Sequence, residues 1–284
     1  MTNYVVYDVF TSEAFGGNPL AVVLDANGLT EKDMRNIARE FNFSETTFVF
    51  PPDDPNHTAK VRIFTPAWEL PFAGHPTVGT ALALYDLGLA GDDMTLELKV
   101  GPIPVTIEGR TARFETRVPL TIEEAPDTAA LAACIGQTAS AIRVSNHEPV
   151  LAGVGTPFVL AELESDAALA EAAPNTDAFL QAAGGEVGRL GLFVYRRDGH
   201  SIRARMFAPL GGIPEDPATG SAVAGLVAFL GRLEGQSGTF DIRQGVEMGR
   251  PSRITAEVVV EDGDPVCVAI SGEAVKVMEG RLTV

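Results

Sequence analysis

Two loops of this chain carry side chains that can move protons, and they stand at matching points of an internal repeat. The first copy is RIFTPAWELPFAGHPTVGTALAL, from Arg62, and the second is RMFAPLGGIPEDPATGSAVAGL, from Arg205. In this alignment His75 of the first copy stands opposite Asp216 of the second, and the second loop is two residues shorter. Two such units in order indicate a duplicated α/β half. Because duplicated halves often enclose a cleft, the repeat predicts that His75 and Asp216 face one pocket.

Each copy of the repeat runs from a strand through a loop into an apolar helix. Free backbone N–H groups at the start of such a helix, together with its dipole, form a site for an anion. The glycines of the repeat, Gly79 and Gly220, permit a tight turn or a close backbone approach. Thr80 and Ser221 follow them and would either cap the helix or donate to a ligand. We expect Thr80 to be a cap and Ser221 to contact a ligand.

Glu45 is a third candidate, because it stands in the otherwise apolar and hydroxyl-bearing stretch FNFSETTFVF. If this carboxylate is buried, burial would raise its pKa toward the range of a general base. The alternative is a glutamate on the exposed face of a strand or in a helix-to-strand turn. Glu215 and Asp216 are adjacent on an extended segment and should point to opposite sides, so only one faces a pocket. The repeat selects Asp216.

Several chemistries lack their sequence motif. The chain has no GxSxG, no P-loop, no dinucleotide-binding GxGxxG after a strand, and no HExxH or carboxylate cluster. Its two cysteines, Cys134 and Cys267, are far apart and have no metal-binding spacing. We therefore expect them to be buried, reduced thiols. The sequence predicts a site with no metal and no cofactor.

The composition limits the partners of the protein. The formal net charge is −17 over 284 residues, which disfavours a nucleic-acid partner but leaves room for a small anionic substrate held by local dipoles. No apolar run reaches the roughly 20 residues of a membrane span, and the first residues lack a basic segment followed by an apolar one. We therefore expect a cytoplasmic protein that binds neither nucleic acid nor membrane.

Hydrophobic spacing locates the helices. Residues 30–41 have one apolar face and Thr30 as a suitable N-cap, which predicts an amphipathic helix. Residues 77–88 and 221–231 are apolar on nearly all faces, which predicts helices that a sheet surrounds. Most of the remaining regular structure consists of short β-branched runs typical of strands.

The amino-acid composition of the sequence changes between residues 119 and 126. The segment 121–136 is first acidic and then rich in alanine, and it contains no strand signal before 141–145. We therefore place a domain boundary here and predict domains over residues 1–118 and 119–284. The C-terminal strand is the one segment that could return to the first domain.

Five segments of the sequence together resemble one known family. They are DVFTSEAFGGNPLAVVLDANGL, FNFSETTFVF, RIFTPAWELPFAGHPTVGTA, RMFAPLGGIPEDPATGSA and GVEMGRPSRI, and they run from residue 8 to residue 254. In this order they resemble the motifs of the phenazine-biosynthesis PhzF-like isomerases. The resemblance implies an α+β fold like that of diaminopimelate epimerase. Such a fold has two similar domains, each a mostly antiparallel or mixed sheet wrapped around a central apolar helix, with the active site in the cleft between them.

The resemblance also implies roles for individual residues. Glu45 would be the catalytic acid/base. The rest of the implied site consists of His75, Asp216 and Ser221, with Gly74 and Gly220 donating backbone N–H groups to a substrate carboxylate. The best-understood member of the family isomerises trans-2,3-dihydro-3-hydroxyanthranilate by moving a proton between carbons, without a cofactor. The resemblance further implies a homodimer.

Racemases of the same fold use a pair of cysteines at the two helix starts, but this sequence has Ala73 and Thr219 around those places. A two-thiol mechanism is therefore not expected. The sequence favours a cofactor-independent isomerase that acts on a small carboxylate-bearing molecule, cyclic and amino-acid-like in the family's example. The alternatives are a racemase or epimerase with Glu45 as its single base, and a non-catalytic protein that binds small carboxylates.

The absence of metal-binding motifs from the sequence has a direct test. Turnover should be the same before and after dialysis against a chelator, because proton transfer by side chains needs no Lewis acid. Activity that is lost with the chelator and returns with a divalent ion would contradict the motif analysis.

Overall fold

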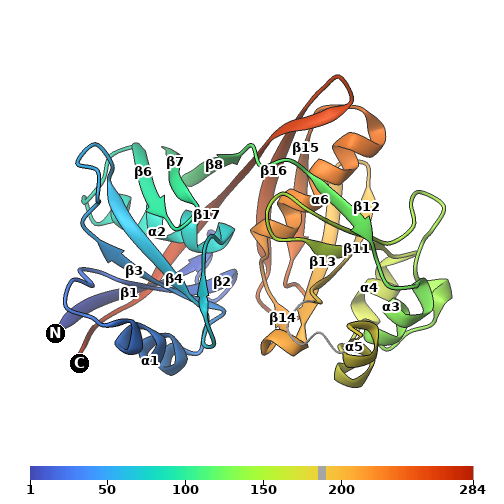
Figure 1. Cartoon of the computed structure of the whole chain (residues 1–284), viewed down its shortest axis with the longest axis horizontal. Helices are drawn as coiled ribbons and strands as arrows, with labels where there is room; N and C mark the ends of the chain where they lie inside the picture. The colour runs from blue at the N-terminus through green and yellow to red at the C-terminus, as the bar shows by residue number, and fades with distance from the viewer. Residues whose placement is uncertain (185–189, 284) are drawn as a thin grey trace. The chain divides into compact units, whose positions relative to one another are not determined.

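The computed structural model describes residues 1–184 and 190–283. The chain forms two compact units, which we call unit 1 (residues 1–115 with the segment from 270 onward) and unit 2 (residues 116–269). Each unit consists of a sheet packed around a long apolar helix (Figure 1). The predicted α+β fold with a central helix in each half is therefore confirmed.

The strands of unit 1 form a ring in which each strand is hydrogen-bonded to its neighbours. In order, the ring consists of β17 (Asp264–Leu282), β1 (Thr2–Val9), β2 (Asn18–Val23), β3 (Glu45–Phe50), β4 (Ala59–Phe64), β6 (Asp93–Leu98), β7 (Gly101–Glu108) and β8 (Thr111–Thr116), after which β8 pairs with β17 again. β2 runs parallel to β3, and β4 runs parallel to β6, so the sheet is mixed. The short strand β5 (Glu69–Leu70) adds to β4.

One helix, α2 (Gly74–Asp86), lies inside this ring (Figure 1). It contacts β1, β2, β3, β6 and β7, and every residue from Gly74 to Leu84 is buried. A helix in such surroundings must be apolar on all sides, as its sequence is. Gly79 is required for the close approach, because a Cβ there would lie 2.6 Å from side-chain atoms of both Val9 and Leu20.

The helix α1 (Glu31–Phe41) packs against β3 and β4 of the same unit. Thr30 caps it as predicted, because its side chain accepts from the backbone N–H of Asp33 while the Asp33 carboxylate accepts from the N–H of Thr30. This reciprocal capping box satisfies two N–H groups that the helix cannot use. The apolar face of α1 buries Met34, Ile37 and Ala38.

Unit 2 has a second mixed sheet. Its strands pair in the order β9 (Thr121–Glu124), β10 (Val150–Gly153), β11 (Phe158–Glu162), β12 (Leu192–Asp198), β13 (Ser201–Ala208), β15 (Gly238–Gln244) and β16 (Ser252–Glu261), and β14 (Ile213–Asp216) also pairs with β13. The helix α6 (Gly220–Glu234) contacts β10, β11, β15 and β16. Gly225 lets it approach β10, because a Cβ there would lie 3.1 Å from the Cα of Gly153.

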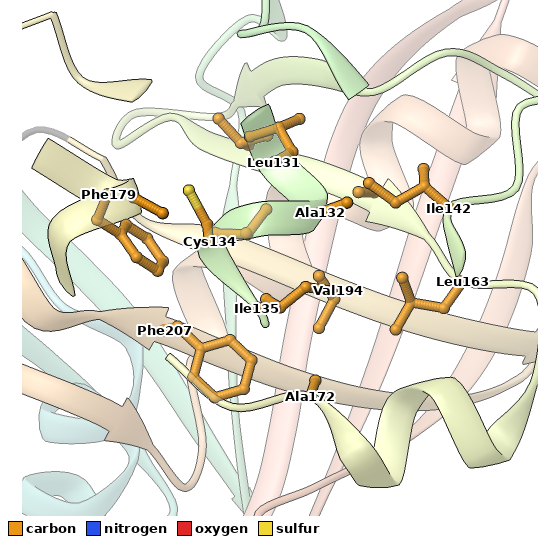
Figure 2. Close-up of a cluster of buried hydrophobic side chains, with 14 of the residues drawn as sticks. Leu131, Ala132, Cys134, Ile135, Ile142, Leu163, Ala172, Phe179, Val194 and Phe207 are labelled. Atoms are coloured by element: carbon orange, nitrogen blue, oxygen red, sulfur yellow. The ribbon is translucent and has the colours of Figure 1, made fainter. Parts of the chain in front are cut away.

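Three short helices of unit 2, α3 (Thr128–Cys134), α4 (Asp166–Glu171) and α5 (Thr176–Ala182), enclose an apolar cluster with the sheet. Figure 2 shows Cys134 of this cluster among aliphatic and aromatic side chains such as Phe179. Burial raises the pKa of the Cys134 thiol to about 11, so it stays protonated and unreactive. Cys267 is also buried and is not part of a disulfide, and the prediction that both cysteines are buried is confirmed.

An arginine–glutamate pair anchors the loop of the repeat in each unit. In unit 1, Nε and Nη2 of Arg62 donate to Glu69 at 2.8 and 2.9 Å. In unit 2, the same atoms of Arg205 donate to Glu215 at 2.7 and 2.8 Å. Each guanidinium also lies 5.0 Å from the ring centre of the phenylalanine two residues further along. This shared geometry supports the duplication, and it commits Glu215 to a structural ion pair.

The structure corrects the register of the repeat. α2 begins at Gly74 and α6 at Gly220, and each start follows the glutamate of its ion pair by five residues. Gly220 therefore corresponds to Gly74 and not to Gly79, which lies within α2. His75 is in the first turn of its helix, whereas Asp216 ends β14, before α6 begins. The expectation of equivalent loop positions for His75 and Asp216 was wrong, because the alignment matched the His-Pro and Asp-Pro letters across a loop of different length.

The same shift overturns the prediction that Thr80 caps a helix. Thr80 lies in the second turn of α2, and its hydroxyl is buried and donates to Thr47 Oγ1 at 2.9 Å. The actual N-cap of α2 is Ala73, which makes no side-chain capping bond. The role of Thr80 is therefore to join the central helix to β3.

The region around the predicted boundary also differs from expectation. Residues 121–124 form β9, which is held by backbone pairing with β10. The sequence of this segment showed no strand signal, because all four residues are exposed and none marks a buried face. Residues 141–145 do not form the predicted strand. A 3₁₀ turn, Ala139–Ala141, precedes a single bridge between Ile142 and Leu163.

The two anchoring arginines should differ in their contribution to stability. Arg205 is the more buried, with 7% of its side chain exposed against 26% for Arg62, and it also donates to the carbonyls of Leu169, Ala170 and Ala172. Arg205→Met should therefore cost about 3–5 kcal/mol of unfolding free energy, because it leaves the largely enclosed carboxylate of Glu215 and three backbone carbonyls without their buried donor.

Arg62→Met serves as the matched control and should cost about 1–2 kcal/mol, since Glu69 keeps Lys99 at 3.6 Å. Urea unfolding of both variants measures the difference. Equal losses would contradict the ranking.

Candidate functional site

The predicted catalytic side chains of unit 1 lie at one end of its sheet. Glu45 is the first residue of β3, and Asn18 is the first residue of β2. Because β2 and β3 are parallel, with Leu20 beside Glu45, both strands begin at the same edge. The N-terminus of α2 meets this edge, which brings Glu45, Asn18 and His75 together.

His75 makes the central contact of this group. Its Nδ1 lies 3.3 Å from Oε2 of Glu45 and 3.5 Å from Nδ2 of Asn18. The imidazole is 4% exposed and the Glu45 side chain 13% exposed. The carboxylate is thus mostly enclosed but still reachable, as a group that exchanges protons with a substrate must be. The exposed-strand alternative for Glu45 does not fit this burial.

Burial lowers the pKa of His75 to about 3, and a contact with the Pro19 carbonyl offsets only part of this effect. The imidazole is therefore neutral at physiological pH, and its 3.3 Å contact with Glu45 is not an ion pair. A neutral imidazole can donate one proton and accept another. Within the described part of the chain, Nε2 of His75 is buried and has no hydrogen-bond partner.

The start of α2 offers backbone N–H groups beside this pair. Thr77 N–H donates to the carbonyl of Ala73, and Pro76 has no N–H. Gly74 and His75 thus carry the N–H groups that the helix does not use, and Ala73 cannot cap them with its side chain. The helix dipole adds to their attraction for an anion. The predicted carboxylate contact at Gly74 stays a prediction that this geometry supports.

In unit 2, Asp216 belongs to a buried polar network in front of α6. Its Oδ2 accepts from the hydroxyl of Thr219 at 2.5 Å. The side chain of Gln244 donates to the Asp216 carbonyl at 2.8 Å and to Thr219 Oγ1 at 3.0 Å, while its Oε1 accepts from the Thr219 N–H at 3.1 Å. Gln244 therefore fixes the loop that carries Asp216, which is itself 5% exposed.

The start of α6 resembles that of α2. Its N-cap, Thr219, makes no side-chain capping bond, and its hydroxyl instead donates to Asp216 and accepts from Gln244. The first intrahelical bond at this end is from Val223 N–H to the Thr219 carbonyl. Gly220 and Ser221 occupy the first two helical positions, so Ser221 is not the N-cap. Its predicted role as a ligand contact stays a prediction.

The six residues predicted from the sequence therefore form two groups. Unit 1 brings together Glu45, His75 and Gly74, and unit 2 places Asp216, Gly220 and Ser221 at the start of α6. Sequence reasoning missed the residues that hold these groups in place, Asn18 and Gln244. Each is a polar residue at the end of an apolar strand, in GGNP and IRQG, and that position was the available signal.

The described residues also bear on other kinds of site. In the ranges 1–184 and 190–283, no three His, Cys, Asp or Glu side chains are grouped so that they could hold a metal ion. No helix in these ranges is long and apolar enough to cross a membrane.

Comparison with known proteins identifies the family. A family model described as phenazine biosynthesis-like protein matches residues 7–280. The chain belongs to this family. Trans-2,3-dihydro-3-hydroxyanthranilate isomerase of Pseudomonas aeruginosa is 37% identical over 289 residues, which cover 99% of each chain. An uncharacterised isomerase of Mesorhizobium japonicum is 40% identical over 306 residues, covering 99% of this chain and 98% of that relative. This PhzF-family chain is accordingly an isomerase.

Solved structures agree with this assignment. A PhzF-family phenazine biosynthesis protein of Bacillus anthracis superposes with a TM-score of 0.89 at 28% identity, covering 100% of this chain and 99% of that one. A probable proline racemase of Agrobacterium radiobacter gives a TM-score of 0.64 at 13% identity, covering 100% and 93%. The latter likeness is one of fold. In this PhzF-family chain the N-caps of the two central helices are Ala73 and Thr219, so neither carries a thiol.

The neutral state of His75 makes stability depend on pH. Unfolding restores a pKa near 6.5, so below that pH the unfolded chain takes up a proton that the folded chain excludes until about pH 3. This contribution to stability is complete above pH 6.5 and is lost as the pH falls toward 3, by at most about 1.4 kcal/mol per pH unit.

Urea unfolding between pH 7 and pH 4 measures the effect. His75→Asn should show a shallower dependence on pH than the wild type, whereas His200→Asn, which changes an exposed histidine, should follow the wild type. Parallel curves for His75→Asn and the wild type would show that His75 does not titrate as described.

Proposed function

We propose that this isomerase moves a proton between two carbons of a small, carboxylate-bearing substrate, with Glu45 as the general acid/base and no cofactor. The observation that carries the proposal is the contact of Glu45 with a buried, neutral histidine at a helix start. This arrangement combines a proton acceptor, a second proton carrier and N–H donors for an anion within one edge of unit 1.

The chemistry follows from these groups. The substrate carboxylate accepts a hydrogen bond from the N–H group of Gly74 at the start of α2, where the helix dipole favours negative charge. The Glu45 carboxylate takes a proton from an activated carbon, and the electron pair of the C–H bond shifts the neighbouring double bond. A proton then returns to the other carbon of the shifted system, from Glu45 itself or through His75 or Asp216.

His75 suits the part of an intermediate carrier. When Glu45 is ionised, the Nδ1–H of a neutral His75 can donate to it, which orients the carboxylate and leaves Nε2 as an acceptor. Once Glu45 holds the substrate proton, the same Nδ1 can be the acceptor in the other tautomer. A charged imidazolium would instead attract the carboxylate and weaken it as a base.

The role of Asp216 rests on the family resemblance and on its own surroundings. The hydroxyl of Thr219 and the amide of Gln244 hold its loop in one position. A buried carboxylate with fixed hydrogen bonds can take or return a proton at a defined point. That Asp216 and Ser221 contact the substrate stays a prediction from the family resemblance.

The relative from Pseudomonas aeruginosa gives the first substrate to test. Its name states that it isomerises trans-2,3-dihydro-3-hydroxyanthranilate, which is a cyclic amino acid with a carbon-bound proton to move. The identity of 37% over the whole chain supports a substrate of this class. This identity does not determine which substituents the ring of the substrate carries.

Glu45→Gln should reduce turnover of trans-2,3-dihydro-3-hydroxyanthranilate by about 10²–10⁴-fold, because glutamine keeps the shape of the side chain but cannot carry the proton. Deuterium incorporation from solvent into the product, followed by NMR, measures the step directly. Thermal unfolding should change little. Glu108→Gln, at an exposed position of β7, is the matched control and should retain both rate and exchange.

Three outcomes separate the proposal from its alternatives. Exchange that persists in Glu45→Gln at nearly the wild-type rate would exclude Glu45 as the base. Exchange with loss of chirality but without a double-bond shift would indicate an epimerase. Binding of substrate by the wild type without turnover or exchange would indicate that this substrate is only bound.

A further inference from the structure

Unit 2 contains a polar pocket that the proposed reaction does not use. It has a volume of about 570 Å³, and its walls come from the loop 143–147, the ends of β11 and β12, and the last turns of α6. Ser221 starts α6, whereas Leu230, Leu233 and Glu234 of the pocket lie near its end. At a rise of 1.5 Å per residue, the pocket and the helix start are about 14–20 Å apart along α6. The pocket is therefore separate from the candidate site residues of unit 2.

A buried carboxylate without a full set of partners lines this pocket. Glu162, the last residue of β11, is 1% exposed. Its Oε2 accepts from Asn146 at 2.7 Å, but its Oε1 has no hydrogen bond within the described part of the chain. The nearest cation, Nη1 of Arg196, is 3.6 Å from Oε1. A buried carboxylate oxygen in this state gains from any donor that reaches it.

Two arginines that line the pocket also have N–H donors without a hydrogen-bond partner among the described residues. Arg196 donates to the backbone carbonyl of Arg197, and no other hydrogen bond of its guanidinium is formed within the described residues. Nε of Arg143 is buried and likewise has no partner there, although its Nη2 pairs with Glu164 at 3.1 Å. Guanidinium groups with unused N–H donors favour a carboxylate ligand.

His147 also lines the pocket, but both of its ring nitrogens are already hydrogen-bonded, so it does not compete for these groups. His147 Nδ1 donates to the carbonyl of Glu148 at 2.7 Å, so Nε2 is left to accept from the Tyr195 hydroxyl at 2.6 Å. Burial, followed by the charge of Glu162, raises the pKa of Tyr195 well above its usual range. Its hydroxyl therefore stays protonated and bound to His147.

The charges around the pocket indicate what kind of ligand it takes. Three arginines, Arg143, Arg196 and Arg197, line the pocket together with three carboxylates, Glu162, Asp198 and Glu234. Such a balanced lining favours neither a free anion nor a free cation. We propose that this pocket binds a small α-amino acid as its zwitterion. The ammonium group donates to Oε1 of Glu162, the carboxylate accepts from Arg196 and Arg143, and an aliphatic side chain lies on Leu230 and Leu233.

Calorimetric titration of the full chain with three probes of one carbon skeleton tests the proposal. L-leucine carries both charges, 4-methylpentanoate carries only the carboxylate, and 3-methylbutylamine carries only the ammonium. L-leucine should bind at least tenfold more tightly than either of the others. Glu162→Gln and Arg196→Gln should each weaken L-leucine binding by about 10–100-fold, because each removes a charge-assisted hydrogen bond.

Two exposed positions of unit 2 give matched controls. Glu261→Gln and Arg253→Gln should leave L-leucine binding within twofold of the wild type. If Glu162→Gln does not fold, Arg196→Gln decides the matter, since Arg196 is 28% exposed and its loss leaves the sheet intact. The proposal is overturned if 10 mM L-leucine gives no binding, if the three probes bind equally, or if the folded pocket variants bind L-leucine like the wild type.

Discussion

The burial of an apolar helix inside a sheet is the constraint on which the rest of this structure depends. The side of α2 contacts five strands, and only small or apolar side chains fit there, as Gly79 shows by its distance from Val9 and Leu20. Polar chemistry is therefore confined to the end of the helix, where unused N–H groups cannot be buried without a partner. The sheet edge that meets this end carries Glu45, and its chemistry follows from that position.

The same constraint explains why the histidine is neutral. His75 is in the first turn of a buried helix, so its ring is withdrawn from water while its Nδ1 still reaches Glu45. Desolvation outweighs the hydrogen bond to the Pro19 carbonyl, and the pKa of His75 falls to about 3. In unit 2 the corresponding helix start is occupied by Ser221, and the carboxylate of Asp216 stands on the preceding loop. The two units thus share a buried central helix, but different side chains stand at its start: His75 in unit 1 and Ser221 in unit 2.

The sequence was sufficient for the parts of the structure that depend on pattern. The all-apolar runs of α2 and α6 predicted central helices, and the cap of α1 was predicted from Thr30. The register between the halves was not predictable in this way, because matching letters at His75 and Asp216 concealed loops of different length. The ion pairs of Arg62 and Arg205 fix the true register, and they depend on contacts that no local pattern contains. Gln244 and Asn18 were missed although each is a polar residue at the end of an apolar strand, because their hydrogen-bond partners are distant in the sequence.

The strand β17 makes the completion of unit 1 depend on the last part of the chain to be synthesised. Residues 270–282 belong to unit 1 and close its ring by pairing with β1 and β8, yet they are synthesised after the whole of unit 2. During translation, the first hundred residues therefore have their central helix but lack the strand that completes the sheet around it. Unit 2 can fold first, although most of unit 1 leaves the ribosome earlier. The closing contact joins residues more than 250 positions apart, such as Thr2 and Leu282, and contacts of such high order form slowly. The edges of β1 and β8 remain exposed to other chains until that step is complete.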